Sequence, residues 1–110
     1  MPNPSFPPLI RHLSDRIDIQ SGAYRVSKEG QEQLAWSLWR SVWAYLQSVE
    51  NPVPPELSWK PTAYRVVLRG DSGFPRLFRV IWHNTIFVPT TNLKLSPKHP
   101  WISFSMLETR

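Results

Sequence analysis

The most continuous hydrophobic pattern in the chain runs from Ser27 to Val49. Plotted at about 100° per residue, as in an α-helix, its apolar side chains gather on one broad arc. The members of this arc are Leu34, Ala35, Leu38, Trp39, Val42, Tyr45, Leu46 and Val49. Ser27 can cap the first turn, and Asn51-Pro52 would end the helix because a residue before proline avoids the α conformation. The pattern therefore predicts one long amphipathic helix.

Two tryptophans make the apolar arc of this helix wider than a single packing face requires. Trp36 and Trp43 extend the arc to roughly 200°, whereas a surface helix needs an apolar stripe of only about 100°. The extra strip has two possible neighbours. One is another segment of this chain, such as a proline-rich stretch, and the other is a partner protein or a second copy.

Strand patterns lie on both sides of the predicted helix. Ile17 and Ile19 alternate with polar residues, which predicts a short strand. Ser21-Gly22 then favours a turn, with Ala23–Val26 returning as a second short strand. Three further segments of strand character follow the helix, and they are Thr62–Arg69, Arg76–Trp82 and Thr85–Val88.

The turns between the later strands are suggested by residue type. Gly70–Gly73 supplies loop residues between the first and second of these segments. His83-Asn84 predicts a two-residue turn between the second and third, because asparagine tolerates the positive φ that such a turn requires. The three segments therefore form an antiparallel meander in this interpretation.

The register of this meander can be argued from burial. Placing Val66 opposite Val80, and Val80 opposite Phe87, gives one wholly apolar or aromatic face. That face comprises Tyr64, Val66, Leu68, Phe78, Val80, Trp82 and Phe87. A slip of one residue would instead bury Arg79 in the core, and an unpaired buried guanidinium costs several kcal/mol. We therefore expect the apolar face to pack on the helix.

The second face of the sheet mixes arginines with aliphatic residues. Its members are Arg65, Val67, Arg69, Leu77, Arg79, Ile81, Ile86 and Val88. A face meant for water would carry more threonine, lysine and glutamate. Either the C-terminal segment covers it, since Ile102, Phe104 and Met106 alternate with serines, or it is an exposed platform of arginine and aliphatic side chains.

These elements together predict a single α+β domain over residues 9–110, in which one long amphipathic helix packs on a three- to five-stranded antiparallel sheet. Residues 1–8 contain four prolines and predict an extended tail. The 110 residues include no cysteine, which excludes disulfides, cysteine-ligated zinc and thiol catalysis.

Charge and hydropathy bear on partners and location. Thirteen lysines and arginines against eight acidic residues give a net charge of +5. Such a surplus suits nucleic acid or an acidic protein surface, and it also serves plain solubility. No apolar run approaches the roughly 18 residues of a membrane span. We therefore expect a soluble, cytoplasmic protein with no membrane partner.

The residues available for catalysis are sparse. His12, His83 and His99 lie far apart in the sequence and have no metal-ligand spacing. There is no glycine-rich phosphate loop and no G-x-S-x-G motif. We expect no metal, no cofactor, no small-molecule substrate and no catalytic site.

One catalytic alternative rests on size and element order alone. Small basic α+β ribonucleases, including bacterial toxins that cut mRNA without a metal, are loosely similar to the predicted arrangement. The resemblance covers no motif. It would imply roles for the cations of the sheet together with Tyr64 and His83.

The leading hypothesis is a non-enzymatic protein-binding module, or accessory subunit of a larger complex, whose partner is another protein or a second copy of this chain. Tryptophan and arginine dominate interface energetics, so the candidate contact residues are Trp36, Trp43, Arg65, Arg69 and Arg79. The alternative is a basic protein that binds RNA or DNA through the same arginines.

Overall fold

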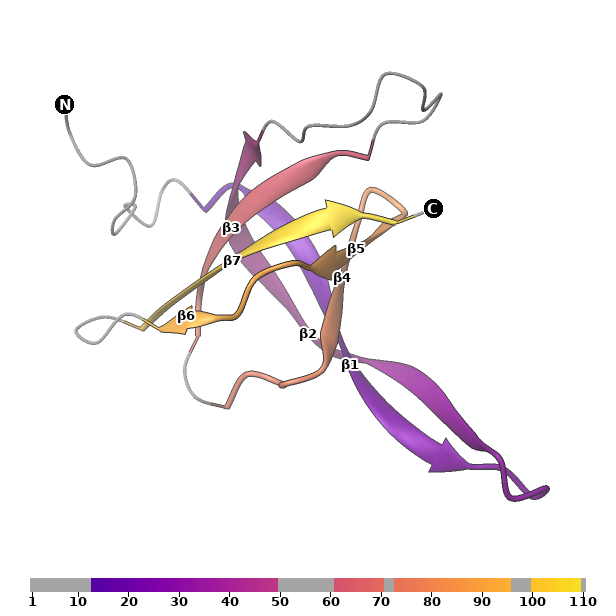
Figure 1. The fold of residues 1–110 in the computed structure, drawn as a ribbon. Helices are drawn as coiled ribbons and strands as arrows, with labels where there is room; N and C mark the ends of the chain where they lie inside the picture. Colours follow the sequence, from indigo (N-terminus) through magenta and orange to yellow (C-terminus); the bar gives the residue numbers. More distant parts are fainter. Residues whose placement is uncertain (1–12, 50–60, 71–72, 96–99, 110) are drawn as a thin grey trace, which may run out of the picture.

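The computed structural model describes residues 13–49, 61–70, 73–95 and 100–109, and these contain strands and turns but no helix (Figure 1). The strands are β1 (Asp15–Val26), β2 (Glu32–Val49), β3 (Ala63–Arg69), β4 (Phe78–Trp82), β5 (Thr85–Pro89), β6 (Lys94–Leu95) and β7 (Trp101–Glu108). The chain is therefore all-β, and the predicted α+β class is wrong. The predicted tail over residues 1–8 lies outside the described residues.

The antiparallel sheet closes on itself. Its strand order is β3-β2-β1-β4-β5-β7-β6, and β3 pairs with β7 as well as with β2. The strands β1 to β5 and β7 therefore surround a common interior, and we call this closed part of the sheet the cylinder. The short strand β6 pairs with a further part of β7. Closure gives these strands a neighbour on each side, which removes the free edges of an open sheet.

The segment predicted to be a long helix is the strand β2. It runs antiparallel to β1 along the whole of β1. The register shifts once, because Ile19 pairs with Arg40 whereas Gln20 pairs with Leu38. This β-bulge leaves Trp39 as an extra, unpaired residue on β2. The alternation of inward-facing and outward-facing side chains along β2 is therefore reversed from one side of the bulge to the other. Apolar residues also occupy odd-numbered positions of the strand, among them Trp39, Trp43 and Tyr45, which is why its pattern resembles a helix.

A hairpin loop, not a helix start, follows Ser27. The Ser27 hydroxyl accepts a hydrogen bond from the amide of Gln31 at 3.1 Å, and the Ser27 amide donates to the Gln31 carbonyl at 2.7 Å. Gly30 has a φ of 80°, a left-handed conformation that glycine adopts without steric cost. This loop joins β1 to β2. The turn predicted at Ser21-Gly22 is wrong, because β1 continues through it to Val26.

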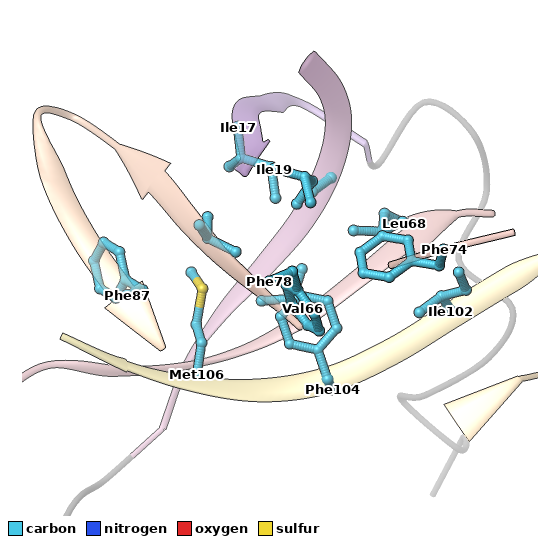
Figure 2. Close-up of a cluster of buried hydrophobic side chains, with 12 residues drawn as sticks. Ile17, Ile19, Val66, Leu68, Phe74, Phe78, Phe87, Ile102, Phe104 and Met106 are labelled. Carbon is cyan, nitrogen blue, oxygen red and sulfur yellow. The ribbon is translucent and has the colours of Figure 1, made fainter. Parts of the chain in front are cut away.

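The interior of the cylinder is filled by inward-facing side chains from every strand except β6 (Figure 2). The buried cluster comprises Ile17, Ile19, Ala44, Val66, Leu68, Phe74, Phe78, Val80, Phe87, Ile102, Phe104 and Met106. The predicted apolar face is confirmed as part of this core. Its register is only half right, because Val80 pairs with Phe87 but Val66 pairs with Leu46 and Phe104.

The C-terminal segment does form a strand with one apolar side, but it does not cover the second face of the sheet. β7 lies beside β3 within the cylinder, with Phe104 opposite Val66 and Ile102 opposite Leu68. Its alternating apolar residues point into the core, where Ile102 is 0% exposed. The alternation predicted the strand correctly, whereas its place in the sheet depends on long-range pairing.

Aromatic side chains pack near both ends of β4. At its first residue, Phe78 lies edge-on to Phe74 with ring centroids 4.8 Å apart, and Phe74 also meets Trp39 at 5.1 Å. At its last residue, Trp82 lies edge-on to Tyr64 at 5.2 Å. Edge-to-face pairs of this kind stabilise packing beyond the area that they bury.

The hairpin between β4 and β5 confirms the predicted turn and gives a stability test. His83 and Asn84 have φ values of 50° and 58°. Asn84→Val should lower the free energy of unfolding by about 1–2 kcal/mol, because a β-branched residue is strained at positive φ. Asn84→Gly should keep or raise stability. Urea titration of both variants measures the difference, and equal midpoints for the valine and glycine variants would contradict this account of the turn.

Candidate functional site

The strands β1 and β2 extend beyond the cylinder as a two-stranded projection (Figure 1). β4 pairs with β1 only from Asp18 to Ser21, and β3 pairs with β2 only from Ala44 onward. Where the projection leaves the cylinder, the Gly22 amide donates to the Leu77 carbonyl at 2.9 Å. We call residues 22–38 the arm.

The arm has one apolar face. The register places Tyr24 opposite Leu34 and Gly22 opposite Trp36 on this face. Its side chains are exposed to a large extent: Tyr24 63%, Val26 72%, Leu34 40% and Leu38 61%. The opposite face carries small and polar residues, namely Ala23, Arg25, Gln33, Ala35 and Ser37.

This distribution is unusual for a projection surrounded by water. An isolated two-stranded hairpin is marginally stable at best, and contiguous exposed apolar side chains mark interaction sites. Within the part of the chain that the structure describes, nothing packs on Tyr24 or Val26 closely enough to bury them. The apolar face of the arm is therefore the candidate functional site.

Trp36 fixes the base of this face to the cylinder. It is half-buried, and the Arg79 guanidinium lies 4.6 Å from the centroid of its ring. The Arg79 Nε also donates to Oε1 of Gln20 at 2.6 Å. A Cβ atom built on Gly22 would lie 2.9 Å from Cζ3 of Trp36 and 3.0 Å from Leu77. The absence of a side chain at Gly22 thus makes room for the indole.

This close approach gives a second stability test. Gly22→Val should displace the Trp36 ring or Leu77 and cost about 1–2 kcal/mol of unfolding free energy, as overpacking does. Ala23→Val on the opposite, exposed face is the matched control and should be neutral or slightly stabilising, because valine favours strands. Urea titration followed by tryptophan fluorescence measures both. Equal stabilities for the two variants would show that Gly22 is not needed for this packing.

Trp43 marks a second exposed apolar area, near the other end of β2. Its side chain is 51% exposed, and the Arg16 guanidinium lies 5.3 Å from its ring centroid. It borders an open hollow of about 470 Å³ that is also lined by Leu13, Val42 and Arg69. We call this the Trp43 hollow. Among the described residues that line it, Arg69 alone is polar.

The five residues predicted for contact fall into two pairs and one single residue. Trp36 lies against Arg79, and Trp43 shares its hollow with Arg69. Arg65 is exposed on β3. The predicted single platform of three arginines is not formed, because β3 and β4 lie three strands apart in either direction around the cylinder.

Apart from Trp36, sequence reasoning missed the residues of the arm. Tyr24, Val26 and Leu38 were assigned to a short strand or to a helix, and none was a candidate. A signal was present, because the chain alternates on both sides of the Lys28-Glu29-Gly30 loop. Such mirrored alternation around a glycine-containing loop indicates a hairpin with one apolar face.

The described residues offer little for catalysis. No group of three or more histidine, aspartate or glutamate side chains among them could hold a metal ion. No helix in the same ranges is long and apolar enough to cross a membrane. His83 lies in the β4–β5 turn, whereas His12 and His99 fall outside the described residues.

Comparison with known proteins gives a fold but no family. No family model matches this chain, and no curated protein matches it. A chain from a solved structure described as the virion of a native gene transfer agent particle is similar, with a TM-score of 0.64 and 14% sequence identity. The match covers 86% of this chain and 93% of that chain. At this identity the likeness concerns the fold alone.

Proposed function

We propose that this chain is a non-enzymatic structural subunit of a phage-like particle, held there by protein contacts of its arm. The observation that carries the proposal is the exposed apolar face of the arm, with Tyr24 and Val26 among its least covered side chains. The similar chain from the virion of a gene transfer agent supports the particle as the setting.

The physical argument begins with the packed cylinder. Its interior is filled by aliphatic and aromatic side chains, so contacts with other molecules fall to the outer surface and the arm. Tyrosine and the branched aliphatic residues of the arm stand on paired strands, which lose little conformational freedom on binding. A pre-ordered apolar surface of this kind suits a permanent protein contact.

The proposal is tested by following the chain in particles. Particles produced by the cells that encode it are treated with nuclease, sedimented through a density gradient and probed for the chain. We expect the chain to sediment with the particles at a fixed ratio to their other proteins. The double variant Tyr24→Ser with Leu38→Ser should remain at the top of the gradient, because apolar anchors dominate such interfaces.

The control is Val88→Ser, which alters an exposed aliphatic residue on β5 and should sediment as the unaltered chain does. Finding the unaltered chain only in the light fractions would overturn the proposal. Loss of the chain on nuclease treatment would instead favour the predicted nucleic-acid alternative. That alternative also requires a steep fall of affinity with salt, about one unit of log–log slope per phosphate neutralised.

A further inference from the structure

We infer that the arm of one copy of this chain binds in the Trp43 hollow of a second copy, so that copies associate head to tail. The inference rests on the proposed function, since it names the molecule that the arm contacts in a particle. It is carried by two separate exposed apolar surfaces on one chain, with charges of opposite sign beside them.

The arm cannot reach the hollow of its own chain. Leu34 on the arm and Trp43 at the hollow belong to the same strand, β2. They are nine positions apart (43 − 34), which is about 30 Å along an extended strand. Because paired strands cannot fold back on themselves, the contact has to be made with another molecule.

The apolar parts of the two surfaces match in character. The arm presents Tyr24 and Leu38 from its two paired strands, and both are more than half exposed. The hollow presents Leu13, Val42 and Trp43 around an open volume of about 470 Å³. A hollow of this size can accept one large side chain of the arm while its rim covers the neighbouring ones.

The charges are complementary as well. The apolar face of the arm carries one charged residue in its strands, Glu32, which pairs with Val26. The loop at the tip holds Lys28 and Glu29, whose charges offset each other. The hollow is lined by Arg69, and Arg16 lies over Trp43. An acidic position therefore meets a basic rim, which favours this orientation of the contact.

The arrangement has a defined symmetry. The arm and the hollow are different surfaces, so each contact leaves one arm and one hollow unused. Head-to-tail contacts of this type build closed rings of subunits or open filaments, and not simple two-fold dimers. The chain would thus form repeating assemblies from a single kind of interface.

The test uses purified chain and light scattering coupled to size exclusion. The unaltered chain should elute, at rising concentration, as multiples of its 12.9 kDa mass. An arm variant, Tyr24→Ser with Leu38→Ser, and a hollow variant, Trp43→Ser, should each be monomeric, with association weakened at least about tenfold. Val88→Ser should assemble as the unaltered chain does.

Mixing the arm variant with the hollow variant gives the decisive measurement. The arm variant keeps an intact hollow and the hollow variant keeps an intact arm, so an equimolar mixture should form a dimer that grows no further. Circular dichroism and urea titration of each variant establish that it is folded. Should Trp43→Ser fail to fold, Leu13→Asp in the lining takes its place as the hollow variant.

The charge argument has its own test. Glu32→Arg alone should weaken association about two- to fivefold at low salt, as expected for an exposed ion pair. Combining Glu32→Arg with Arg69→Glu in one chain should restore the association. Failure of the double variant to recover would show that these two residues do not face each other.

The outcomes separate this inference from the proposed function. An unaltered chain that stays monomeric, or variants that remain monomeric when mixed, would overturn the head-to-tail contact. If such a monomeric chain still sediments with particles, the proposed function stands and the arm binds a different protein. If the chain assembles in solution but is absent from particles, the proposed function fails instead.

Discussion

Replacing Val80 by aspartate is expected to prevent the chain from folding. Val80 is 0% exposed and lies at the centre of the cylinder, between Ile19 on β1 and Phe87 on β5. Among the described residues no charged side chain is buried, so none of them can pair with the new carboxylate. A buried unpaired charge costs more than most small domains can lose from a total stability of about 5–15 kcal/mol. Circular dichroism and amide NMR dispersion at neutral pH should both show an unfolded chain.

The matched control is Val88→Asp, the same substitution on the neighbouring strand. Val88 is 37% exposed, so its carboxylate can remain in water. We expect this variant to fold, with a change within about 0.5 kcal/mol as at other surface positions. A folded Val80→Asp variant would mean that the interior of the cylinder is open to water, contrary to the packing described above.

Phe74→Ala is expected to lower the free energy of unfolding by about 3–5 kcal/mol, the usual cost of truncating a buried aromatic residue. Phe74 comes from the segment between β3 and β4, not from a strand, yet it is only 6% exposed. Its ring touches those of Trp39, Phe78 and Phe104. Truncation would leave a cavity at that end of the core, because three other rings would lose a common neighbour.

Urea titration measures this loss, with Leu95→Ala as the control. Leu95 is 52% exposed on β6, and its truncation should change the midpoint little. A small effect for Phe74→Ala would show that the segment before β4 can leave the core without consequence. In that case the end of the cylinder would be closed by Trp39 and Phe104 alone.

The later strands could be predicted because their signals are local. Two-residue alternation together with the His83-Asn84 turn indicated the segments that became β3, β4 and β5. The same alternation indicated β7. What local signals could not supply was the neighbour of each strand, since β3 pairs with β2 and β7 and not with β4.

The helix prediction was wrong for a physical reason. Because of the bulge after Leu38, the side of the sheet that even-numbered residues of β2 face changes from outward before the bulge to inward after it. On the arm, Leu34 and Trp36 face outward, whereas Val42 and Leu46 farther along pack against the core. Because the odd-numbered residues Trp39, Trp43 and Tyr45 are apolar as well, spacings of three and four arise, which are also the spacings of a helix. Tryptophan, valine and tyrosine are enriched in strands, so the composition of this segment favours the strand that β2 forms.

The candidate site was predictable in part. The width of the apolar arc, which exceeds one packing face, indicated Trp36 and Trp43, and both lie on the outer side of β2. Their pairing with Arg79 and Arg69 depends on the closed topology, which the sequence does not reveal. The arm was hidden because Tyr24 and Leu34 were assigned to different elements, although the register places them opposite each other.

The continuity of β1 and β2 from the cylinder into the arm has a mechanical consequence. A load applied at the Lys28-Glu29 tip would run lengthwise along both strands into the cylinder, where the hydrogen-bond ladders of β1 with β4 and of β2 with β3 would resist it in shear. The anchoring end of each strand is set in the core by Ile17 and Ala44, which are 1% and 0% exposed. The arm therefore behaves as a stiff lever and not as a tether, and whatever grips its tip also sets the orientation of the whole subunit.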